Sequence, residues 1–524
     1  MRSLFERRID TLSKSSGDIF NGRQLGIEKE SLRITEEGRI SKASHPHALG
    51  SALTNRYITT DYSEALLEFV TPPLKHGWAS IQFLYEIHSA VYSSLDDELL
   101  WPFSMPCRLN DESDIPIAHY GSSNIGRVKS IYREGLGHRY GKYMQAISGI
   151  HFNYSLPRSF WKLWQQLSLE DKKNKSGEDI ISHAYFGLVR NIRRLDWLLL
   201  YLFGASPSVC GSFLEGTPIG LEKMRDNTFF GKNATSLRMS DIGYQNSNQA
   251  SIYVSANSLE EYVNDLSKAV ASTNDDYRSL GIKKGNEYLQ LNANQLQIEN
   301  EYYSTIRPKR VASSGDTPTS ALRQGGVEYV ELRALDISPF DPIGFNTQQQ
   351  KFLEAFLLYA LLMESPPISD AERDEIRENQ LLVAMSGRKP GLKLRRNDSM
   401  EKLDDWAKEI FEHLDPICKL LDDEDELEDG FSEALSSQLA AVQDSDLTPS
   451  SKLISDLDES GLEFSEYGLK VALEYRDYFN NLSDDFNNHK LVFTQEAEDS
   501  LRRQLEIEQK DSISLDDYIK RYYS

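Results

Sequence analysis

The chain has 524 residues, three cysteines and a formal net charge of −23 at pH 7. This charge argues against a nucleic-acid partner. Three cysteines in a chain of this length argue against a disulfide framework, and their spacing is not that of metal ligands. The most apolar patch, residues 197–203, is far shorter than the roughly 18 residues of a membrane span, and the N-terminus has no apolar signal segment, so we expect a cytoplasmic protein without a membrane partner.

The acidity is concentrated at the end of the chain. Residues 401–524 contain 33 acidic and 12 basic side chains, whereas residues 1–400 contain 48 and 46. We therefore expect a nearly neutral sheet-and-helix domain over residues 1–400, with room for basic sites that bind anionic ligands. An acidic, mainly helical region over residues 401–524 is expected to pack on this domain or to be appended to it.

The first predicted strand, residues 25–34 with the sequence LGIEKESLRI, has two acids on one face. Glu28 and Glu30 are two residues apart, and alternate residues of a strand point the same way. Repulsion between such neighbours raises their pKa unless a cation lies between them. Mg²⁺ takes oxygen ligands and binds substrate phosphates, so it would turn this repulsion into coordination. The alternative is an exposed strand face with two solvated acids.

Two more acids follow in the next apolar segments. Asp61 comes after two threonines, where it is a candidate metal ligand or the cap of a turn. Glu68 lies in the predicted strand ALLEFV, residues 65–70, which Pro72 and Pro73 end. We expect both carboxylates to join the acids of the first strand.

Residues 120–143 are rich in glycine, basic and aromatic side chains. Gly121 and Gly126 have the spacing of a phosphate-binding P-loop, but Arg127 and Val128 stand where that motif requires Lys and then Ser or Thr. We therefore reject the motif and expect a flexible substrate loop whose tyrosines line a small pocket.

Two later strands alternate clearly between apolar and polar residues. In residues 147–156, His151 lies on the polar face, opposite a row of apolar side chains. In residues 327–335, Glu331 and Arg333 share the polar face. Residues 288–300 show a weaker alternation. The alternatives are a core histidine with satisfied hydrogen bonds and a plain ion pair between Glu331 and Arg333.

The order of the elements predicts the fold class. The strands lie far apart in sequence and are separated by helical stretches, which favours an α+β fold with a largely antiparallel sheet. Residues 350–365 look like a core helix, and the chain after about residue 366 is mainly helical and polar. The run DDEDELED, residues 422–429, is expected to be a solvated loop or helix end.

The polar faces of these strands would form one site if they belong to one sheet. About five carboxylates would then converge, and two or three Mg²⁺ ions with a nucleotide triphosphate would satisfy them. Arginines would approach the phosphates or an acidic substrate from the side, because the guanidinium binds such groups bidentately. The candidates are Arg133, Arg238, Arg307, Arg310 and Arg333. For Arg307 and Arg310 the alternative is a basic surface turn.

Long, ordered blocks of the sequence resemble a known family. They are GIEKESLRI, HPHALGSALTNRYITTDYSEALLEFVTP, LWPFSMPC, YGSSNIGRVKSIYREGL, RYGKYMQAISGIHFNYSLP, YLFGASP, ATSLRMSDIGY, LQIENEYYSTIRPKR and GGVEYVELRALDISPF. Together they are similar to the gammaproteobacterial type of glutamate–cysteine ligase. The likeness runs from about residue 20 to about residue 390, and the last quarter of the chain matches poorly.

This resemblance implies a reaction and a fold. The family joins the γ-carboxylate of L-glutamate to the amine of L-cysteine while ATP becomes ADP and phosphate, as the first step of glutathione synthesis. The implied fold is a curved, mainly antiparallel sheet like the catalytic half of glutamine synthetase, with helices around it. We expect a γ-glutamyl phosphate intermediate, Mg²⁺ with Mn²⁺ as the alternative, and a monomer that binds only small molecules.

The resemblance also implies roles for single residues. The metal ligands fall on Glu28, Glu30, Asp61, Glu68, His151 and Glu331. The glutamate-binding arginine falls on Arg238, and the cysteine pocket on Tyr62, Tyr132, Gln145, Tyr244 and Tyr303. We expect Arg133, Arg307, Arg310 and Arg333 to bind ATP, and Arg133, Arg333 and Glu331 to act in catalysis.

Two alternatives keep parts of this interpretation. A ligase of the same superfamily would use another amino acid or a polyamine as the acceptor, although a polyamine would need acids where residues 132–143 are basic. A catalytically silent protein would only bind metal or amino acid. Release of ADP that requires both glutamate and an amine would separate these alternatives.

Overall fold

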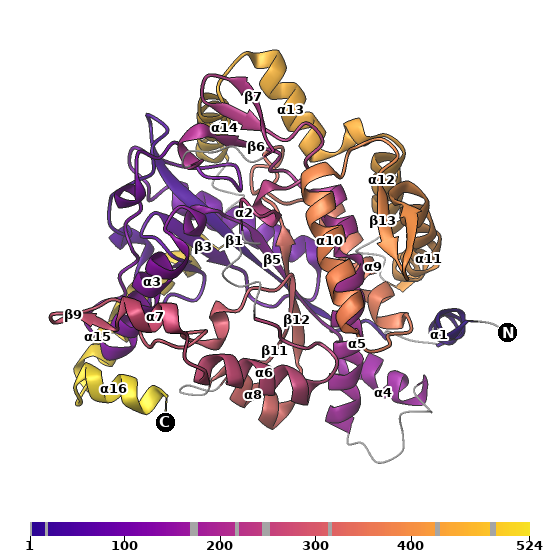
Figure 1. Cartoon of the computed structure of the whole chain (residues 1–524), viewed down its shortest axis with the longest axis horizontal. Coiled ribbons are helices and arrows are strands. Elements are labelled where there is room, and N and C mark those ends of the chain that lie inside the picture. The colour runs from indigo at the N-terminus through magenta and orange to yellow at the C-terminus, as the bar shows by residue number, and fades with distance from the viewer. Residues whose placement is uncertain are drawn as a thin grey trace.

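The computed structural model describes residues 3–15, 19–167, 177–214, 220–243, 252–312, 317–424, 430–482 and 489–523. Within them, a seven-stranded sheet crosses the centre of the molecule (Figure 1). Its strands are β1 (Gln24–Thr35), β2 (Ile58–Thr60), β3 (Leu66–Val70), β4 (Glu98–Leu100), β5 (Ile150–Ser155), β11 (Ile306–Lys309) and β12 (Tyr329–Leu335). The order is β11-β12-β5-β1-β3-β2, β4 also pairs with β1, and every pairing is antiparallel. The predicted α+β class with a mainly antiparallel sheet is confirmed.

The predicted alternation along the strands gives this sheet an apolar face. Phe152 of β5 lies opposite Ile27 of β1 and Leu332 of β12, and all three side chains are fully buried. Alternate residues of a strand point to opposite faces, so the same pairing turns His151 and Glu331 to the other side. One face is thus fixed in the core while the other is free to hold polar side chains.

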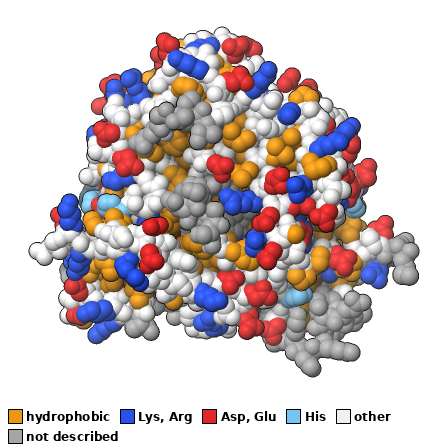
Figure 2. Space-filling model, viewed as in Figure 1, with side chains coloured by type: hydrophobic (Ala, Val, Ile, Leu, Met, Phe, Trp, Pro, Cys, Tyr) orange, Lys and Arg blue, Asp and Glu red, His pale blue; other side chains and the backbone are white. Residues whose placement is uncertain are grey.

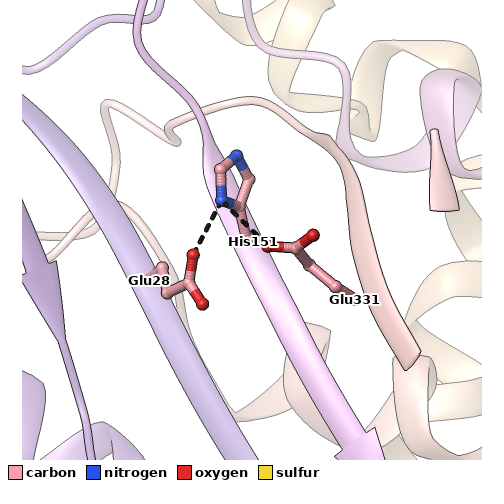
Figure 3. A group of neighbouring side chains, drawn as sticks. All are labelled: Glu28, His151 and Glu331. Carbon is pink, nitrogen blue, oxygen red and sulfur yellow. Dashed lines mark hydrogen bonds and ion pairs between the residues drawn. The ribbon is translucent and has the colours of Figure 1, made fainter. Parts of the chain in front are cut away.

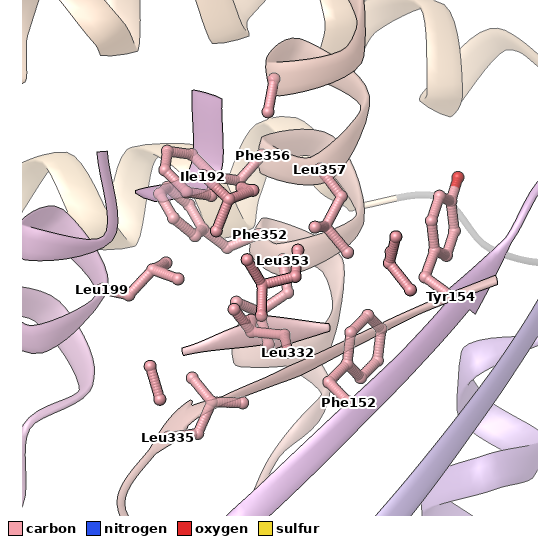
Figure 4. Packing of buried hydrophobic residues seen from close by; sticks show 14 of the residues in the cluster. Phe152, Tyr154, Ile192, Leu199, Leu332, Leu335, Phe352, Leu353, Phe356 and Leu357 are labelled. Atoms are coloured by element: carbon pink, nitrogen blue, oxygen red, sulfur yellow. The ribbon is translucent and has the colours of Figure 1, made fainter. Parts of the chain in front are cut away.

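Helices cover the apolar face of the sheet. They are α2 (Gly77–Tyr92), α5 (Gly177–Phe203) and α9 (Thr347–Leu362). The last of these is the predicted core helix, and Figure 4 shows its Phe352, Leu353 and Phe356 beside Leu332 and Phe152 of the strands. Each fully buried side chain of this size contributes about 1.5–3 kcal/mol to folding. This packing holds the strands, and therefore the polar face, in place.

The expectation of a flexible loop over residues 120–143 is wrong, because Asn124–Tyr140 form helix α3. Glycine lowers helix propensity, and this misled the prediction. Two of the glycines in α3 allow close packing instead. A Cβ atom at Gly126 would meet a backbone oxygen at 2.2 Å, and one at Gly135 would meet the side chain of Gln297 at 2.1 Å.

The weak strand predicted over residues 288–300 is wrong beyond its first residue. Only Glu287–Tyr288 form a strand, β10, which pairs with β9 (Lys283–Lys284). The next residues bond to the backbone through their side chains, as where Asn292 Nδ2 donates to the Gln297 carbonyl. Polar side chains that bond locally in this way compete with a strand ladder.

After residue 366 the chain is mainly helical, as predicted, apart from the hairpin of β13 (Lys393–Arg396) and β14 (Ser399–Lys402). The helices are α10 (Asp370–Ser386), α11 (Leu403–Glu424), α12 (Phe431–Gln443), α13 (Pro449–Ser460), α14 (Phe464–Asn480), α15 (Lys490–Lys510) and α16 (Leu515–Tyr522). Helices α11 and α12 pack on α9, α14 and α15 pack on α2, and α16 packs on α3. Most of the acidic run, residues 425–429, lies outside the described residues.

The remaining elements surround this frame. They are α1 (Leu4–Ser13), α4 (Arg158–Leu167), α6 (Leu259–Ala271), α7 (Asp275–Leu280), α8 (Pro318–Gly325) and the small sheet of β6 (Ser208–Cys210), β7 (Glu222–Arg225) and β8 (Thr228–Phe230). On the face seen in Figure 2, acidic and basic side chains are interspersed. Within the described ranges, none of the helices has the length and apolar character needed to cross a membrane.

Candidate functional site

The strand register brings polar residues from separate strands together. The opposed pairs are Glu28 with His151, Glu30 with Glu68, and Asn153 with Glu331. Side chains directly opposite each other in an antiparallel pair share a face and lie about 4.5–5.5 Å apart at Cβ. These six residues define the polar face of the sheet. Pairing of four strands therefore suffices to gather residues that are 300 positions apart in the chain.

Glu28, His151 and Glu331 lie close enough together to bind one ion. One oxygen of each carboxylate and one ring nitrogen lie within 4.8 Å of one another (Figure 3). Nδ1 of His151 is 3.1 Å from Oε2 of Glu28 and 3.9 Å from Oε1 of Glu331. Carboxylates and a neutral imidazole are ligands for divalent cations, so the donor set suits a metal.

The charges at this cluster leave its donors available. Burial acts to raise the pKa of Glu331, but the cations Lys309 and Arg333 lower it below its ordinary value. Burial and Glu331 act to raise the pKa of Glu28, yet the hydrogen bond and charge of His151 leave it lowered. Burial and the charge of Arg333 lower the pKa of His151. At pH 7 both carboxylates are ionised and the imidazole is neutral.

The neighbouring pair on the polar face behaves in the opposite way. Burial and the charge of Asp61 raise the pKa of Glu30 to about 8. Burial and the same aspartate raise the pKa of Glu68 well above its ordinary value. At pH 7 the Glu30 carboxyl therefore holds a proton, which a divalent cation would displace, because a metal binds the ionised form.

Two buried oxygens on the polar face have no hydrogen bond within the described part of the chain. They are Oε2 of Glu331 and Oδ1 of Asn153. The glutamate oxygen forms an ion pair with Nζ of Lys309 at 3.4 Å. Buried acceptors are rarely left without a hydrogen bond in native proteins. A buried oxygen that has an ion pair but no hydrogen bond, beside two other metal-type donors, fits a hard divalent cation.

Basic side chains border the cluster from β11 and β12. Nη1 of Arg333 lies 3.2 Å from Oε1 of Glu331. Arg307 and Lys309 are two residues apart on β11, so they share a face. Nη2 of Arg307 donates to the carbonyls of Asn300, at 3.1 Å, and Tyr302. These bonds fix its guanidinium at the rim of the polar face.

Arg133 approaches the cluster from helix α3. Its Nε donates to the carbonyl oxygen of Asp61, and its guanidinium lies over the ring of Tyr120, 4.6 Å from the centroid. A guanidinium held by a carbonyl and an aromatic ring has little freedom left, which lowers the entropy cost of binding an anion. Helix α3 therefore supplies a preorganised cation to the site, although a loop was expected there.

A large cavity opens over the polar face. It has a volume of about 730 Å³, within the range of small-molecule sites. Its polar wall is formed by Glu28, Asp61, Glu68, Lys129, Arg133, His151, Asn300, Arg307, Lys309, Glu331 and Arg333, and the remaining wall by Ile125, Val128, Tyr132, Leu291, Ile298, Ile513, Tyr518, Arg521 and Tyr522. One side of this cavity thus suits phosphates and metal, and another suits an apolar ring.

A smaller cavity of about 120 Å³ adjoins it. Its walls are Glu30, Asp61, Tyr62, Tyr132, Arg133, Leu136, Tyr140, Met144, Gln145, His151, Arg238, Asn300, Glu301, Tyr303, Arg307 and Arg333. Seven residues line both cavities: Asp61, Tyr132, Arg133, His151, Asn300, Arg307 and Arg333. The two cavities therefore meet beside the metal-type donors and the arginines.

Arg238 is held in the smaller cavity by buried groups. Its Nη2 donates to the carbonyl of Arg333 at 3.0 Å, and its Nη1 lies 3.7 Å from Oδ1 of Asp336. Asp336 in turn accepts hydrogen bonds from the hydroxyls of Ser206 and Ser236. Gly149 makes room for the guanidinium, since a Cβ atom there would lie 2.1 Å from Nη2.

Comparison with known proteins assigns the chain to a family. The model of the family described as glutamate-cysteine ligase matches residues 9–383. The chain belongs to the glutamate–cysteine ligase family. It is an enzyme that joins glutamate to cysteine in glutathione synthesis.

Individual members of the family match over the whole chain. The glutamate–cysteine ligase of Alcanivorax borkumensis is 45% identical over 100% of both chains, and that of Azotobacter vinelandii is 44% identical over 100% of this chain and 98% of its own. A structure of the Francisella tularensis glutamate–cysteine ligase in complex with AMP has a TM-score of 0.88 and 35% identity, covering 96% of this chain and 97% of its own. A bifunctional glutathione synthetase from Pasteurella multocida has a TM-score of 0.72 and 25% identity, covering 95% of this chain and 58% of its own.

Most of the residues predicted for the ligase site line the two cavities. Glu28, Glu30, Asp61, Glu68, His151, Glu331, Arg133, Arg238, Arg307, Arg333, Tyr62, Tyr132, Gln145 and Tyr303 all do so. Arg310 does not, because its guanidinium donates to the carbonyls of Gly325, and of Gly326 at 2.6 Å. Tyr244 lies outside the described residues.

The structure adds residues that the sequence prediction missed. Lys309 lies beside Glu331, and its position two residues after Arg307 is a signal that strand alternation already contained. Asp336 is missed because nothing in the sequence shows that it lies near Arg238. Tyr518 and Tyr522 come from the acidic C-terminal quarter, which gave no sign of a role in the ligase site.

Proposed function

We propose that the two cavities divide the substrates of this ligase between them. ATP and Mg²⁺ bind in the larger cavity, with the phosphates over the polar face, while glutamate and cysteine bind in the smaller one. The observation that supports this most directly is that the cavities meet at Asp61, Arg133, His151 and Arg333. A phosphoryl group has to pass from ATP to glutamate at such a junction, in contact with cations.

Glu28, His151 and Glu331 would hold one Mg²⁺ ion, with Glu30, Asp61 and Glu68 available for others; Mn²⁺ is the alternative. When bound there, the ion would supply positive charge that offsets the charge of the phosphates in phosphoryl transfer. The hard oxygen donors support this assignment, and so does the buried Glu331 oxygen that has no hydrogen bond among the described residues. AMP in the Francisella tularensis relative supports a nucleotide in the same fold.

The chemistry proceeds through an acyl phosphate. The glutamate γ-carboxylate does not react with an amine directly, because hydroxide is a poor leaving group. The carboxylate oxygen attacks the γ-phosphorus of ATP, the bond to ADP breaks, and Arg133 and Arg333 stabilise the charge of the transferring group. The cysteine nitrogen then attacks the acyl carbon, phosphate leaves with the electron pair of the C–O bond, and the amine loses a proton.

The smaller cavity matches two amino acids in its chemistry. Arg238, fixed by Asp336, would bind the carboxylate of glutamate. Tyr62, Tyr132 and Tyr303 would provide apolar walls for the cysteine side chain and hydroxyls for its carboxylate, together with Gln145. We further propose that the enzyme works as a cytoplasmic monomer. Residues 1–400 would supply the sheet and its carboxylates, while residues 513–522 complete the wall of the larger cavity.

The experiment that tests this function measures ADP release while substrates are left out one at a time. We expect ADP only when ATP, Mg²⁺, glutamate and cysteine are all present, and a γ-glutamyl dipeptide as the product in mass spectrometry. ADP formation at the full rate without cysteine would contradict the proposal. A faster reaction with a polyamine than with cysteine would instead support the related amine ligase.

A further inference from the structure

Helix α16, at the C-terminus of the chain, closes one side of the larger cavity. It packs on α3, as Figure 1 shows at the lower edge of the molecule. Tyr518, Arg521 and Tyr522 line the cavity from α16, and Ile513 lines it from the turn before the helix. The sheet with its carboxylates comes from the first 335 residues, so the two parts of this site are supplied by opposite ends of the chain.

Contacts on both sides fix the position of α16. Leu515 and Ile519 are buried with Val128 of α3 and with Leu291. The hydroxyl of Tyr523 donates to the Gln297 carbonyl at 2.8 Å. The helix therefore bridges α3 and the segment around residue 297, which form two walls of the cavity.

Polar bonds reinforce this bridge. Asp516 accepts a hydrogen bond from the hydroxyl of Tyr288 at 2.6 Å and forms an ion pair with Lys283 at 2.9 Å. In front of the helix, Nδ2 of Asn124 donates to the carbonyl of Ile513 at 3.0 Å. These bonds hold the first turn of α16 and leave its last turn, with Tyr522, beside the cavity.

The cavity wall near α16 differs chemically from the polar face. Apolar side chains of α3, Ile125 and Val128, line the cavity together with Ile298 and with Tyr518 and Tyr522 of α16. Tyr522 is 40% exposed and lines the cavity, so part of its surface is available to a ligand. Arg521 is the one charged side chain that α16 adds to this wall, and the aromatic and aliphatic side chains around it suit a flat heteroaromatic ring better than a triphosphate.

We propose that α16 forms the nucleoside end of the ATP site, with the purine base against Tyr518 and Tyr522. This inference rests on the proposed function, which assigns ATP to the larger cavity. It gives ATP a direction: the base lies at the C-terminal helix and the phosphates reach Arg307, Lys309 and the carboxylates. The acidic C-terminal region thereby becomes part of the substrate site.

The test compares Tyr522→Ala with Tyr522→Phe, which keeps the ring. Loss of one base–aromatic stack is expected to raise the KM for ATP about ten-fold in the alanine variant, while the phenylalanine variant stays near the wild type. The KM for glutamate is expected to stay unchanged in both. Inorganic tripolyphosphate, which has no base, is expected to inhibit the wild type and Tyr522→Ala equally.

A matched control is Tyr478→Ala on α14. Tyr478 has a similar exposed fraction, 41%, and packs against Tyr85 and Phe479 away from the described cavity walls. The control is expected to keep the wild-type KM for ATP. A Tyr522→Ala enzyme with an unchanged KM for ATP, or with equally weakened tripolyphosphate inhibition, would overturn the assignment of the base to α16. Because the wild type is assayed alongside for ADP release that needs both amino acids, failure of the proposed function would be seen separately.

Discussion

Glu331 is the residue at which most interactions of the site meet. Its carboxylate contacts His151, Lys309 and Arg333, and one of its oxygens has no hydrogen bond among the described residues. Its lowered pKa keeps it ionised throughout the physiological range. A negative charge in this position fits the metal-ligand role that we propose for Glu331.

We expect Glu331→Gln to lower kcat by about 100-fold or more, because removing a group that stabilises transition-state charge has effects of that order. The glutamine has the same shape, so the melting temperature is expected to change by only a few degrees. Glu328→Gln, at a half-exposed position just before β12, is the control that should keep full activity. ADP release at the wild-type rate from Glu331→Gln would refute this role.

Asp336 acts on the site through Arg238 and does not line either cavity in the described part of the chain. Replacing it with asparagine removes the charge that faces the guanidinium at 3.7 Å. Removing one charge of a buried ion pair loosens the other partner, so we expect Asp336→Asn to raise the KM for glutamate roughly ten-fold or more. The KM for ATP should remain constant. An equal rise in both constants would indicate a general loss of structure instead of a positioning role.

At the scale of the strands, two carboxyls of the polar face have raised pKa values. The pKa of Glu30 is raised to about 8 and that of Glu68 is raised well above its ordinary value, whereas unfolded glutamates ionise near 4.5. The metal-free folded state therefore binds more protons than the unfolded state between these values. The contribution of these two carboxyls to stability is therefore largest below about pH 4.5 and is lost as the pH rises through the folded pKa, about 8 for Glu30.

We expect Mg²⁺ to bind more tightly as the pH rises from 6 to 8, by about ten-fold per pH unit for each proton released. Calorimetric titration in buffers with different ionisation enthalpies would count these protons. Glu30→Gln, which cannot hold an acidic proton, should reduce the count by one. A Mg²⁺ affinity that does not change with pH would contradict the raised pKa of Glu30.

The strands and helix α3 show which parts of the fold and site the sequence can predict. Alternation along 147–156 and 327–335 places His151 and Glu331 on one face, because the side-chain period of a strand is two. Helix α3 escaped prediction because its glycines serve tertiary contacts that no local pattern records. Arg310 was assigned to the site, although strand alternation places it on the other face from Arg307. The same alternation places Lys309 on the face of Arg307.

At the scale of the whole molecule, the C-terminal region is tied to the rest by its core. Phe431 and Leu435 of α12 belong to the same buried cluster as the helices over the apolar face, and Phe464 of α14 is buried with Trp101. Composition could predict that this region is helical and acidic. It could not predict the contacts, because these depend on which apolar face meets which partner.

We expect a chain that ends at residue 429 to be insoluble or strongly destabilised. The deletion removes α12 to α16 and exposes the apolar surface that these helices cover, so the loss should exceed the 5–15 kcal/mol of a typical domain. Soluble fraction and thermal unfolding would measure it, with the full-length chain as the reference. A soluble, active fragment would show that residues 430–524 are only an appendage.

The strand register has a consequence for anyone who prepares this enzyme. A slip of β1 by one residue would exchange its two faces, burying Glu28 and Glu30 in the core and presenting Ile27 and Lys29 to the larger cavity. Such a molecule would be wholly inactive and not merely slow. Counting competent molecules by active-site titration would therefore report the yield of correct refolding, without any structural probe.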